Sequence, residues 1–321
     1  MKVLFIHTES NEIPKYVESL RDLGHEIDTF MFQHALHHGK GPLNIDDDVM
    51  AAVEACKPEM IVYVGACGRC TKPSVGLFAT LNEKVAPCVI IISDAADEMS
   101  PWWKELFEYD EFGCFRVMVA IDGNKNWPFH ERHLTMLTPI SPSWFPNPKR
   151  HSQREVKFGF AGNVGRVYTL PSGRRVGRKL QLDHMVKWGC KIKQRDGTVA
   201  DSWKALETYK EMCRFMLDTR ITPNFSETGS FQRRHVKGRV VEAGLAGCLL
   251  LEEAPSPTRD WFEPGVDFLE YKSIDEAKEL VRRYIDDPDE SEKFGLRLRA
   301  EILAEHTPEK FWGRIISRLR A

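Results

Sequence analysis

Short runs of consecutive apolar residues alternate with amphipathic stretches along the first half of the chain. The apolar runs predict strands at residues 2–8, 25–32, 60–66, 87–94 and 115–122. Strands that are apolar at consecutive positions are typical of a sheet covered on both faces. The stretches between them, such as 11–24, 46–56 and 72–83, place their apolar residues at helical spacing. This alternation predicts a parallel α/β sheet with helices on both sides.

The alternation stops at residues 138–155 and then starts again. That segment, TPISPSWFPNPKRHSQRE, holds four prolines and has no hydrophobic period, so we interpret it as an interdomain linker. The later strands are expected at 156–163, 190–194, 220–226, 248–254 and 267–273, and the later helices at 173–189, at 202–217 and from about 275 onward.

These two runs of elements predict two doubly wound, Rossmann-like domains, 1–145 and 146–321, with the last helix able to pack back on the N-terminal domain. Ligands of such folds bind outside the carboxyl ends of the strands. We therefore expect the two domains to face each other across a cleft that holds the active site.

Composition excludes several classes of protein. The 321 residues carry a formal net charge of −2, which gives no electrostatic footprint for a nucleic-acid partner or an anionic membrane. The longest apolar runs are far shorter than the ~20 residues that span a bilayer, so no transmembrane segment is expected. The N-terminus has the pattern of a first strand, and the scattered cysteines follow no export signal, which favours a cytoplasmic protein.

Two motifs have the residue types of a metal site without its spacing. Cys67 and Cys70 form a single C-x-x-C motif, and a zinc site would need two further ligands. His34, His37 and His38 have no carboxylate or cysteine at ligand spacing. We therefore expect no metal and no cofactor.

A glycine-rich stretch, FGFAGNVGR at 158–166, lies between a predicted strand and a basic segment. Glycines at such a place let the backbone approach an anion, which makes Gly162, Asn163 and Arg166 candidate phosphate contacts. The nearby arginines at 174, 175 and 178 favour this reading, whereas tight strand–helix packing would explain the glycines equally well. The spacing G-x-x-G-x-x-G does not match the dinucleotide fingerprint, which argues against a dehydrogenase.

The stretch HVKGRVVEAGLAGCLLLEE at 235–253 predicts a helix that runs into a buried strand. One interpretation is structural, with Arg239 and Glu242 forming an i,i+3 salt bridge on a packed helix. The other is functional, with Lys237 and Arg239 at the helix N-terminus holding a diphosphate. In that case Glu242, one turn further along, would accept hydrogen bonds from paired sugar hydroxyls. Both interpretations remain open at this point.

From about 156 to 312 the sequence resembles the C-terminal domain of GT-B glycosyltransferases. It is most similar to the spore-maturation-protein-like members of glycosyl transferases group 1, through a K-x-R-x-x-E-x-x-x-x-G core at 237–247 and a downstream F-x-P-G. The resemblance implies a hexosyltransferase-like, metal-independent enzyme that uses a nucleotide-sugar donor, with UDP as the expected nucleotide. The acceptor, whether glycan, protein or small molecule, is not identified.

The resemblance also implies roles for individual residues. Glu242 would contact the ribose, and Lys237, Arg239 and Arg166 would contact the diphosphate. Asn224 and Ser226, in the stretch TPNFSET, would supply further polar contacts. Many retaining members carry a glutamate eight positions before Glu242, where this chain has Arg234, so a retaining mechanism is not supported.

An inverting transfer needs a general base, which we expect from the N-terminal, acceptor-side domain. Asp94, at the end of a predicted strand, is the first candidate, and His7 at the end of the first strand is the second. Helix capping or an arginine partner would explain Asp94 equally well. Two other functions fit the same fold: a sugar-nucleotide 2-epimerase and a non-catalytic nucleotide-sugar-binding protein.

Overall fold

The computed structural model divides the chain into two compact units. It describes residues 1–7, 13–32, 45–64, 72–93, 95, 103–123, 127, 129, 133–165, 167–170, 172–173, 175–194, 202–227 and 233–321. The first unit contains Met1–Pro139, Thr198–Leu206 and Pro308–Ala321, and the second contains Ile140–Gly197 and Glu207–Thr307.

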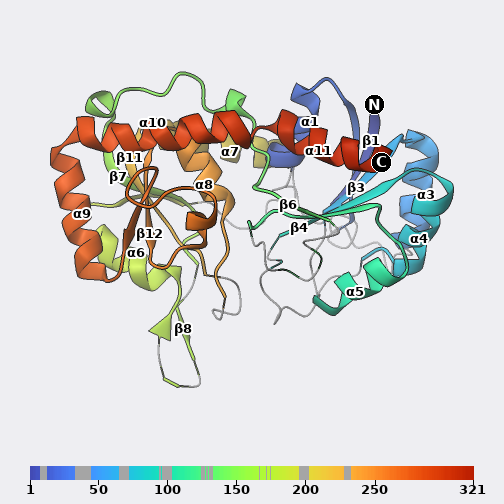
Figure 1. Cartoon of the computed structure of the whole chain (residues 1–321), viewed down its shortest axis with the longest axis horizontal. Helices are drawn as coiled ribbons and strands as arrows, with labels where there is room; N and C mark the ends of the chain where they lie inside the picture. Colours follow the sequence, from blue (N-terminus) through green and yellow to red (C-terminus); the bar gives the residue numbers. More distant parts are fainter. Residues whose placement is uncertain are drawn as a thin grey trace. The chain divides into compact units, whose positions relative to one another are not determined.

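The first unit is a parallel sheet with the strand order β2-β1-β3-β4-β5-β6. Its strands are β1 (Lys2–His7), β2 (Glu26–Met31), β3 (Met60–Val64), β4 (Cys88–Ile92), β5 (Val117–Ala120) and β6 (Leu134–Thr135). Helices α3 (Ile45–Cys56), α4 (Val75–Lys84) and α5 (Trp103–Glu111) contribute to the core on one face of this sheet. Ile13–Val17, a π-helical turn, leads into α1 (Glu18–Asp22), and this segment packs on the other face (Figure 1).

The C-terminal helix completes the core of the first unit. Helix α11 (Pro308–Arg320) buries Phe311, Trp312 and Ile315 in the same hydrophobic cluster as Val17 and other residues of that face. The Trp312 indole Nε1 donates a hydrogen bond to Ser19 Oγ at 2.9 Å. One face of the N-terminal sheet is therefore covered by the last residues of the chain.

The second unit is a parallel sheet with the strand order β10-β7-β11-β12-β13. Its strands are β7 (Val156–Gly162), β10 (Lys191–Gln194), β11 (Thr219–Asn224), β12 (Leu249–Glu253) and β13 (Leu269–Tyr271). Its helices are α6 (Arg178–Val186), most of α7 (Ser202–Leu217), α8 (Gly238–Leu245), α9 (Ile274–Asp286) and α10 (Pro288–Glu305). The chain order of these strands reverses next to β7, so the topological switch point lies between β7 and β11.

One predicted helix begins later than expected. Residues predicted to be helical from 173 instead form part of a hairpin, in which β8 (Tyr168–Thr169) pairs with β9 (Arg175–Val176). Gly177 then has a φ of 117°, a conformation that L side chains rarely adopt and that an α-helix does not contain. Helix α6 therefore begins at Arg178.

The proline-rich segment at 138–155 is anchored to the second unit by two buried side chains. Arg154 donates hydrogen bonds to the carbonyl oxygens of Thr219 at 2.6 Å and Ala246 at 2.8 Å. The His151 ring lies 2.7 Å from the Gly247 carbonyl oxygen through Nε2 and 2.7 Å from Ser291 Oγ through Nδ1. The contact with the Gly247 carbonyl oxygen requires a proton on Nε2.

His151 makes the stability of the fold depend on pH. Burial, and then the charge of Arg154, lower the pKa of His151 from 6.5 to about 4. Between these values the unfolded chain binds a proton that the folded chain does not, so the free energy of unfolding falls as the pH drops from 6.5 toward 4. We expect a loss of about 2 kcal/mol from His151 between pH 7 and pH 5. Urea unfolding at both pH values measures it.

The matched variant for that measurement is His151→Gln, which retains a donor for the Gly247 carbonyl and cannot titrate. Its unfolding free energy should change less over the same pH interval. An equal pH dependence in both proteins would contradict the role of His151.

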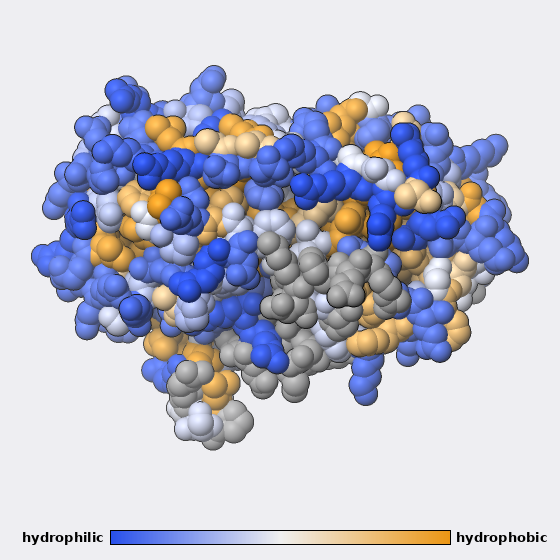
Figure 2. Space-filling model, in the orientation of Figure 1, coloured by the Kyte–Doolittle hydropathy of each residue, from blue (hydrophilic) through white to orange (hydrophobic). Residues whose placement is uncertain are grey.

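Hydrophilic residues cover most of the visible surface in the space-filling view, with small hydrophobic patches between them (Figure 2). Among the helices that the structure describes, none combines the length and the apolar character needed to cross a bilayer.

Candidate functional site

The switch point of the second sheet brings two predicted site residues to one edge. Gly162 ends β7 and Asn224 ends β11, and these strands are neighbours. A Cβ atom at Gly162, whose φ is 144°, would lie 3.0 Å from Nη2 of Arg239. Glycine is therefore needed here to let the guanidinium approach the end of β7, where it donates to the carbonyl oxygen of Ala161.

Two guanidinium groups meet at one aromatic ring beside this edge. The Cζ atoms of Arg178, on α6, and Arg239, on α8, lie 5.7 Å and 5.6 Å from the ring centroid of Phe160. Arg178 also lies 5.7 Å from the ring of Phe225, which follows β11. Its Nη1 donates to the carbonyl oxygen of Asn163 at 2.7 Å, which connects α6 to the glycine-rich loop.

Among the described residues, no carboxylate forms an ion pair with Arg178, and Glu227 supplies only a weaker electrostatic attraction. Burial, and then the charge of Arg239, lower the pKa of Arg178 below its usual value, while Glu227 acts in the opposite direction. Nε of Arg178 is buried and has no hydrogen-bond partner in the part of the chain that the structure describes. A buried donor without an acceptor costs free energy, and an anionic ligand would remove both this cost and the repulsion between the guanidinium groups.

Helix α8 begins at the same edge and adds a second source of positive potential. Lys237 is its N-cap residue, and no side chain of the cap accepts a hydrogen bond from the first turn. Nζ of Lys237 contacts Nε2 of His235. The first turn of such a helix presents backbone N–H groups and the positive end of the helix dipole. Lys237 therefore stands where an anion is favoured.

Glu242 forms the salt bridge that the spacing predicts. Its Oε2 lies 3.0 Å from Nη1 of Arg239, with exposed side-chain fractions of 4% and 11%. Oε1 accepts a hydrogen bond from the Tyr209 hydroxyl at 3.1 Å. Burial, and then Glu242, raise the pKa of Tyr209 well above its usual value, so this phenol is a donor. The carboxylate thus holds Arg239, and the ribose contact of Glu242 stays a prediction.

Asn224 and Ser226 are both buried at the end of β11. The Asn224 side-chain amide donates to Glu252 Oε1, and the Ser226 carbonyl accepts from the His235 backbone N–H at 2.9 Å. Glu252 is itself fully buried, and burial raises its pKa while hydrogen bonds from Ser256 and Asn224 counteract that effect. The structure thus brings Asn224 and Ser226 into the scaffold of the site.

The remaining predicted residues are His7 in the first unit, Asn163 in the second, and two that lie outside the described residues. His7 ends β1 beside β3, at the switch point of the first sheet, and is only 1% exposed. Asn163 is exposed directly after β7 and accepts from the Gly165 N–H at 2.7 Å. Asp94 and Arg166, like the C-x-x-C and histidine motifs, lie outside the described residues.

Sequence reasoning left two residues of this arrangement without a specific role. Arg178 is one of three arginines after the glycine-rich stretch, and the hairpin β8–β9 leaves Arg175 exposed while Arg178 begins α6. Tyr209 lies on α7 and gave no signal, because a tyrosine at a buried helical position reads as core.

Residues 174–317 match the protein family described as glycosyl transferase-like. No curated protein sequence matches the chain. Several solved structures are similar over nearly the whole length, at sequence identities that show the fold alone.

The Anabaena protein HepE in complex with UDP and glucose is 11% identical, covers 100% of both chains and has a TM-score of 0.63. Sucrose-phosphate synthase from Thermosynechococcus elongatus is 10% identical, covers 99% of both chains and has a TM-score of 0.64. An α-glucosyltransferase in complex with UDP-glucose and DNA containing an abasic site is 9% identical, covers 99% of both chains and has a TM-score of 0.61.

These comparisons confirm the predicted resemblance and fold class: an α/β protein of the GT-B type with two Rossmann-like parallel sheets. The prediction of a glycosyltransferase is confirmed at the level of the family domain.

Proposed function

We propose, from a glycosyl transferase-like domain and a GT-B fold, that the protein transfers a sugar from a nucleoside diphosphate donor to an acceptor without a resident metal ion. UDP is the proposed nucleotide, because the similar HepE and α-glucosyltransferase structures contain UDP or UDP-glucose. The acceptor is left open.

The meeting of Arg178 and Arg239 at Phe160 is the observation that carries this proposal. Two neighbouring cations, one with a buried donor that has no described partner, are suited to a group with two linked negative charges. A diphosphate at the β7–β11 switch point would accept from Arg178 and lie beside the first turn of α8. Lys237 would then supply a third positive charge.

The proposed chemistry follows from where charge develops. As the bond between sugar and phosphate breaks, negative charge grows on the departing nucleoside diphosphate. Cations and helix N–H groups that are already in position stabilise that charge more in the transition state than in the ground state. In this proposal Arg178, Arg239 and Lys237 do this work, and Glu242 contacts the ribose.

The acceptor hydroxyl must lose a proton during an inverting transfer, and we propose that a residue of the first unit accepts it. His7 is the last residue of β1, at the carboxyl edge of the first sheet, and Asp94 comes two positions after the end of β4 in the sequence, outside the described residues. A base must come within hydrogen-bond reach of the hydroxyl, directly or through one water. His7→Ala and Asp94→Ala would each identify the base by a lower kcat with unchanged UDP affinity.

The test is a turnover assay with UDP-sugars and GDP-sugars, with and without a panel of acceptors, in EDTA and in Mg²⁺. We expect release of UDP that depends on an acceptor and is unaffected by EDTA. Lys237→Ala should lower this turnover about tenfold or more, because one charged contact to the leaving group is lost.

Three outcomes would contradict the proposal. Interconversion of the donor sugar without an acceptor would indicate an epimerase. Binding without any turnover would indicate a nucleotide-sugar-binding protein, and loss of turnover in EDTA would overturn metal independence.

A further inference from the structure

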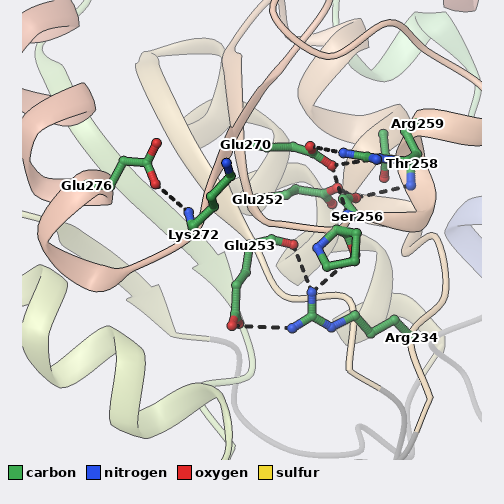
Figure 3. Close-up of polar contacts among 10 residues, drawn as sticks. Arg234, Glu252, Glu253, Ser256, Thr258, Arg259, Glu270, Lys272 and Glu276 are labelled. Atoms are coloured by element: carbon green, nitrogen blue, oxygen red, sulfur yellow. Dashed lines mark hydrogen bonds and ion pairs between the residues drawn. The ribbon is translucent and has the colours of Figure 1, made fainter.

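Glu253, the last residue of β12, uses its two carboxylate oxygens to hold two different elements. Oε1 pairs with Nη2 of Arg234 at 3.3 Å, and Oε2 accepts a hydrogen bond from Gln181 Nε2 at 3.1 Å. Nη1 of Arg234 also donates to the carbonyl oxygens of Glu253 at 3.0 Å and Pro255 at 3.2 Å. Figure 3 shows Arg234 pointing at Glu253 across the end of the strand.

Arg234 fixes the segment that leads into α8. It forms an isolated antiparallel bridge with Glu227, and the next residue, His235, donates its backbone N–H to the Ser226 carbonyl at 2.9 Å. Lys237, three positions after Arg234, is the N-cap of α8. The contacts of Arg234 and His235 therefore hold the segment that immediately precedes the first turn of α8.

Gln181 connects Glu253 to the other cation-bearing helix. It lies three residues after Arg178 on α6, so the two side chains are neighbours on the helix surface. Its Oε1 accepts a hydrogen bond from the Tyr271 hydroxyl at 2.8 Å, which ties the same amide to β13. The amide orientation is thus set from two sides, and Nε2 is directed at Glu253.

We propose that Glu253 is a positioning residue of the diphosphate site. Its single carboxylate spans α6, which carries Arg178, and the entry to α8, which carries Lys237 and Arg239, and so keeps these cations at a fixed spacing. This inference rests on the proposed function. It also explains the arginine at position 234: the guanidinium is occupied by Glu253 and two carbonyl oxygens.

The same edge offers a matched control. Glu270, on the neighbouring strand β13, accepts hydrogen bonds from Arg259 Nε at 3.3 Å and from the Ser256 backbone N–H at 2.8 Å. Both carboxylate–arginine pairs appear in Figure 3. Glu270 contacts neither α6 nor the segment leading into α8 through these bonds, so its removal should perturb stability but not the spacing of the cations.

The experiment compares Glu253→Ala, Glu253→Gln and Glu270→Ala with the unchanged protein, using calorimetric titration with UDP, UMP and uridine. For Glu253→Ala we expect the UDP affinity to fall about tenfold while the uridine affinity is unchanged, because only the phosphate contacts are displaced. Glu253→Gln keeps an acceptor for Arg234, so its UDP affinity should fall only about threefold. Glu270→Ala should bind all three compounds like the unchanged protein.

The melting temperature of each variant is measured alongside. Glu253 and Arg234 are 35% and 29% exposed, so solvent screens the pair and its contribution to stability is small. Equal effects of Glu253→Ala and Glu270→Ala on UDP affinity, or parallel losses for UDP and uridine, would overturn the positioning role while leaving the proposed function intact. No UDP binding by the unchanged protein would overturn both.

Discussion

Replacing Arg178 with alanine is expected to weaken UDP binding about 30-fold, because a charge-assisted hydrogen bond to phosphate contributes about 2 kcal/mol. The folded protein should tolerate the change, since the variant loses a buried Nε without a described partner and the repulsion with Arg239. Calorimetric titration with UDP measures the affinity, and thermal unfolding measures the stability.

The control for this variant is Lys179→Ala, at the next position of α6. Nζ of Lys179 lies 2.7 Å from Asp183 Oδ1 in an exposed pair, so it carries the same charge without facing Phe160. We expect its UDP affinity to match the unchanged protein. If Arg178→Ala also binds UDP normally, the anion site is not where the two guanidinium groups meet.

Replacing Glu242 with alanine is expected to lower the free energy of unfolding by about 3 kcal/mol. The change leaves the largely buried Arg239 guanidinium without its carboxylate and the Tyr209 hydroxyl without its acceptor. Urea unfolding of the variant at neutral pH measures the loss. Tyr209→Phe, which removes only the hydroxyl, should lower the free energy by about 1 kcal/mol.

The same position tests the predicted ribose contact. Glu242→Gln retains an acceptor for Tyr209 and removes the charge, so it should remain folded well enough to titrate with uridine. A lower uridine affinity supports the ribose contact, and an unchanged one leaves Glu242 with a structural role alone. A Glu242→Ala variant as stable as the unchanged protein would contradict the importance of the buried pair.

The strands were predictable because their apolar runs are buried on both faces. Residues 60–66, for example, predict β3 (Met60–Val64), all of whose residues are buried. The segment at 138–155 was misleading in one respect: its prolines and charges read as a linker, yet His151 and Arg154 are buried. Local sequence does not show that Arg154 finds backbone carbonyls 65 and 92 residues away.

The candidate site was predictable where one helix turn or one strand end decides the geometry. Arg239 and Glu242 are three residues apart on α8, so their pairing follows from helix geometry. The approach of Arg178 to Arg239 depends on the β8–β9 hairpin, which precedes α6, and on the pairing of β7 with β11 at the switch point. Glu253 reads as the end of a strand, and its partners Gln181 and Arg234 come from distant segments.

The placement of α11 reverses the order in which the two halves can be completed during synthesis. The strands of the first sheet precede the second unit in the sequence, yet Phe311, Trp312 and Ile315, which cover one face of that sheet, follow it. The second unit ends at Thr307, so all of its residues precede α11. One apolar face of the first sheet therefore stays uncovered until α11 has been synthesised, after the whole second unit. During this period aggregation competes with folding.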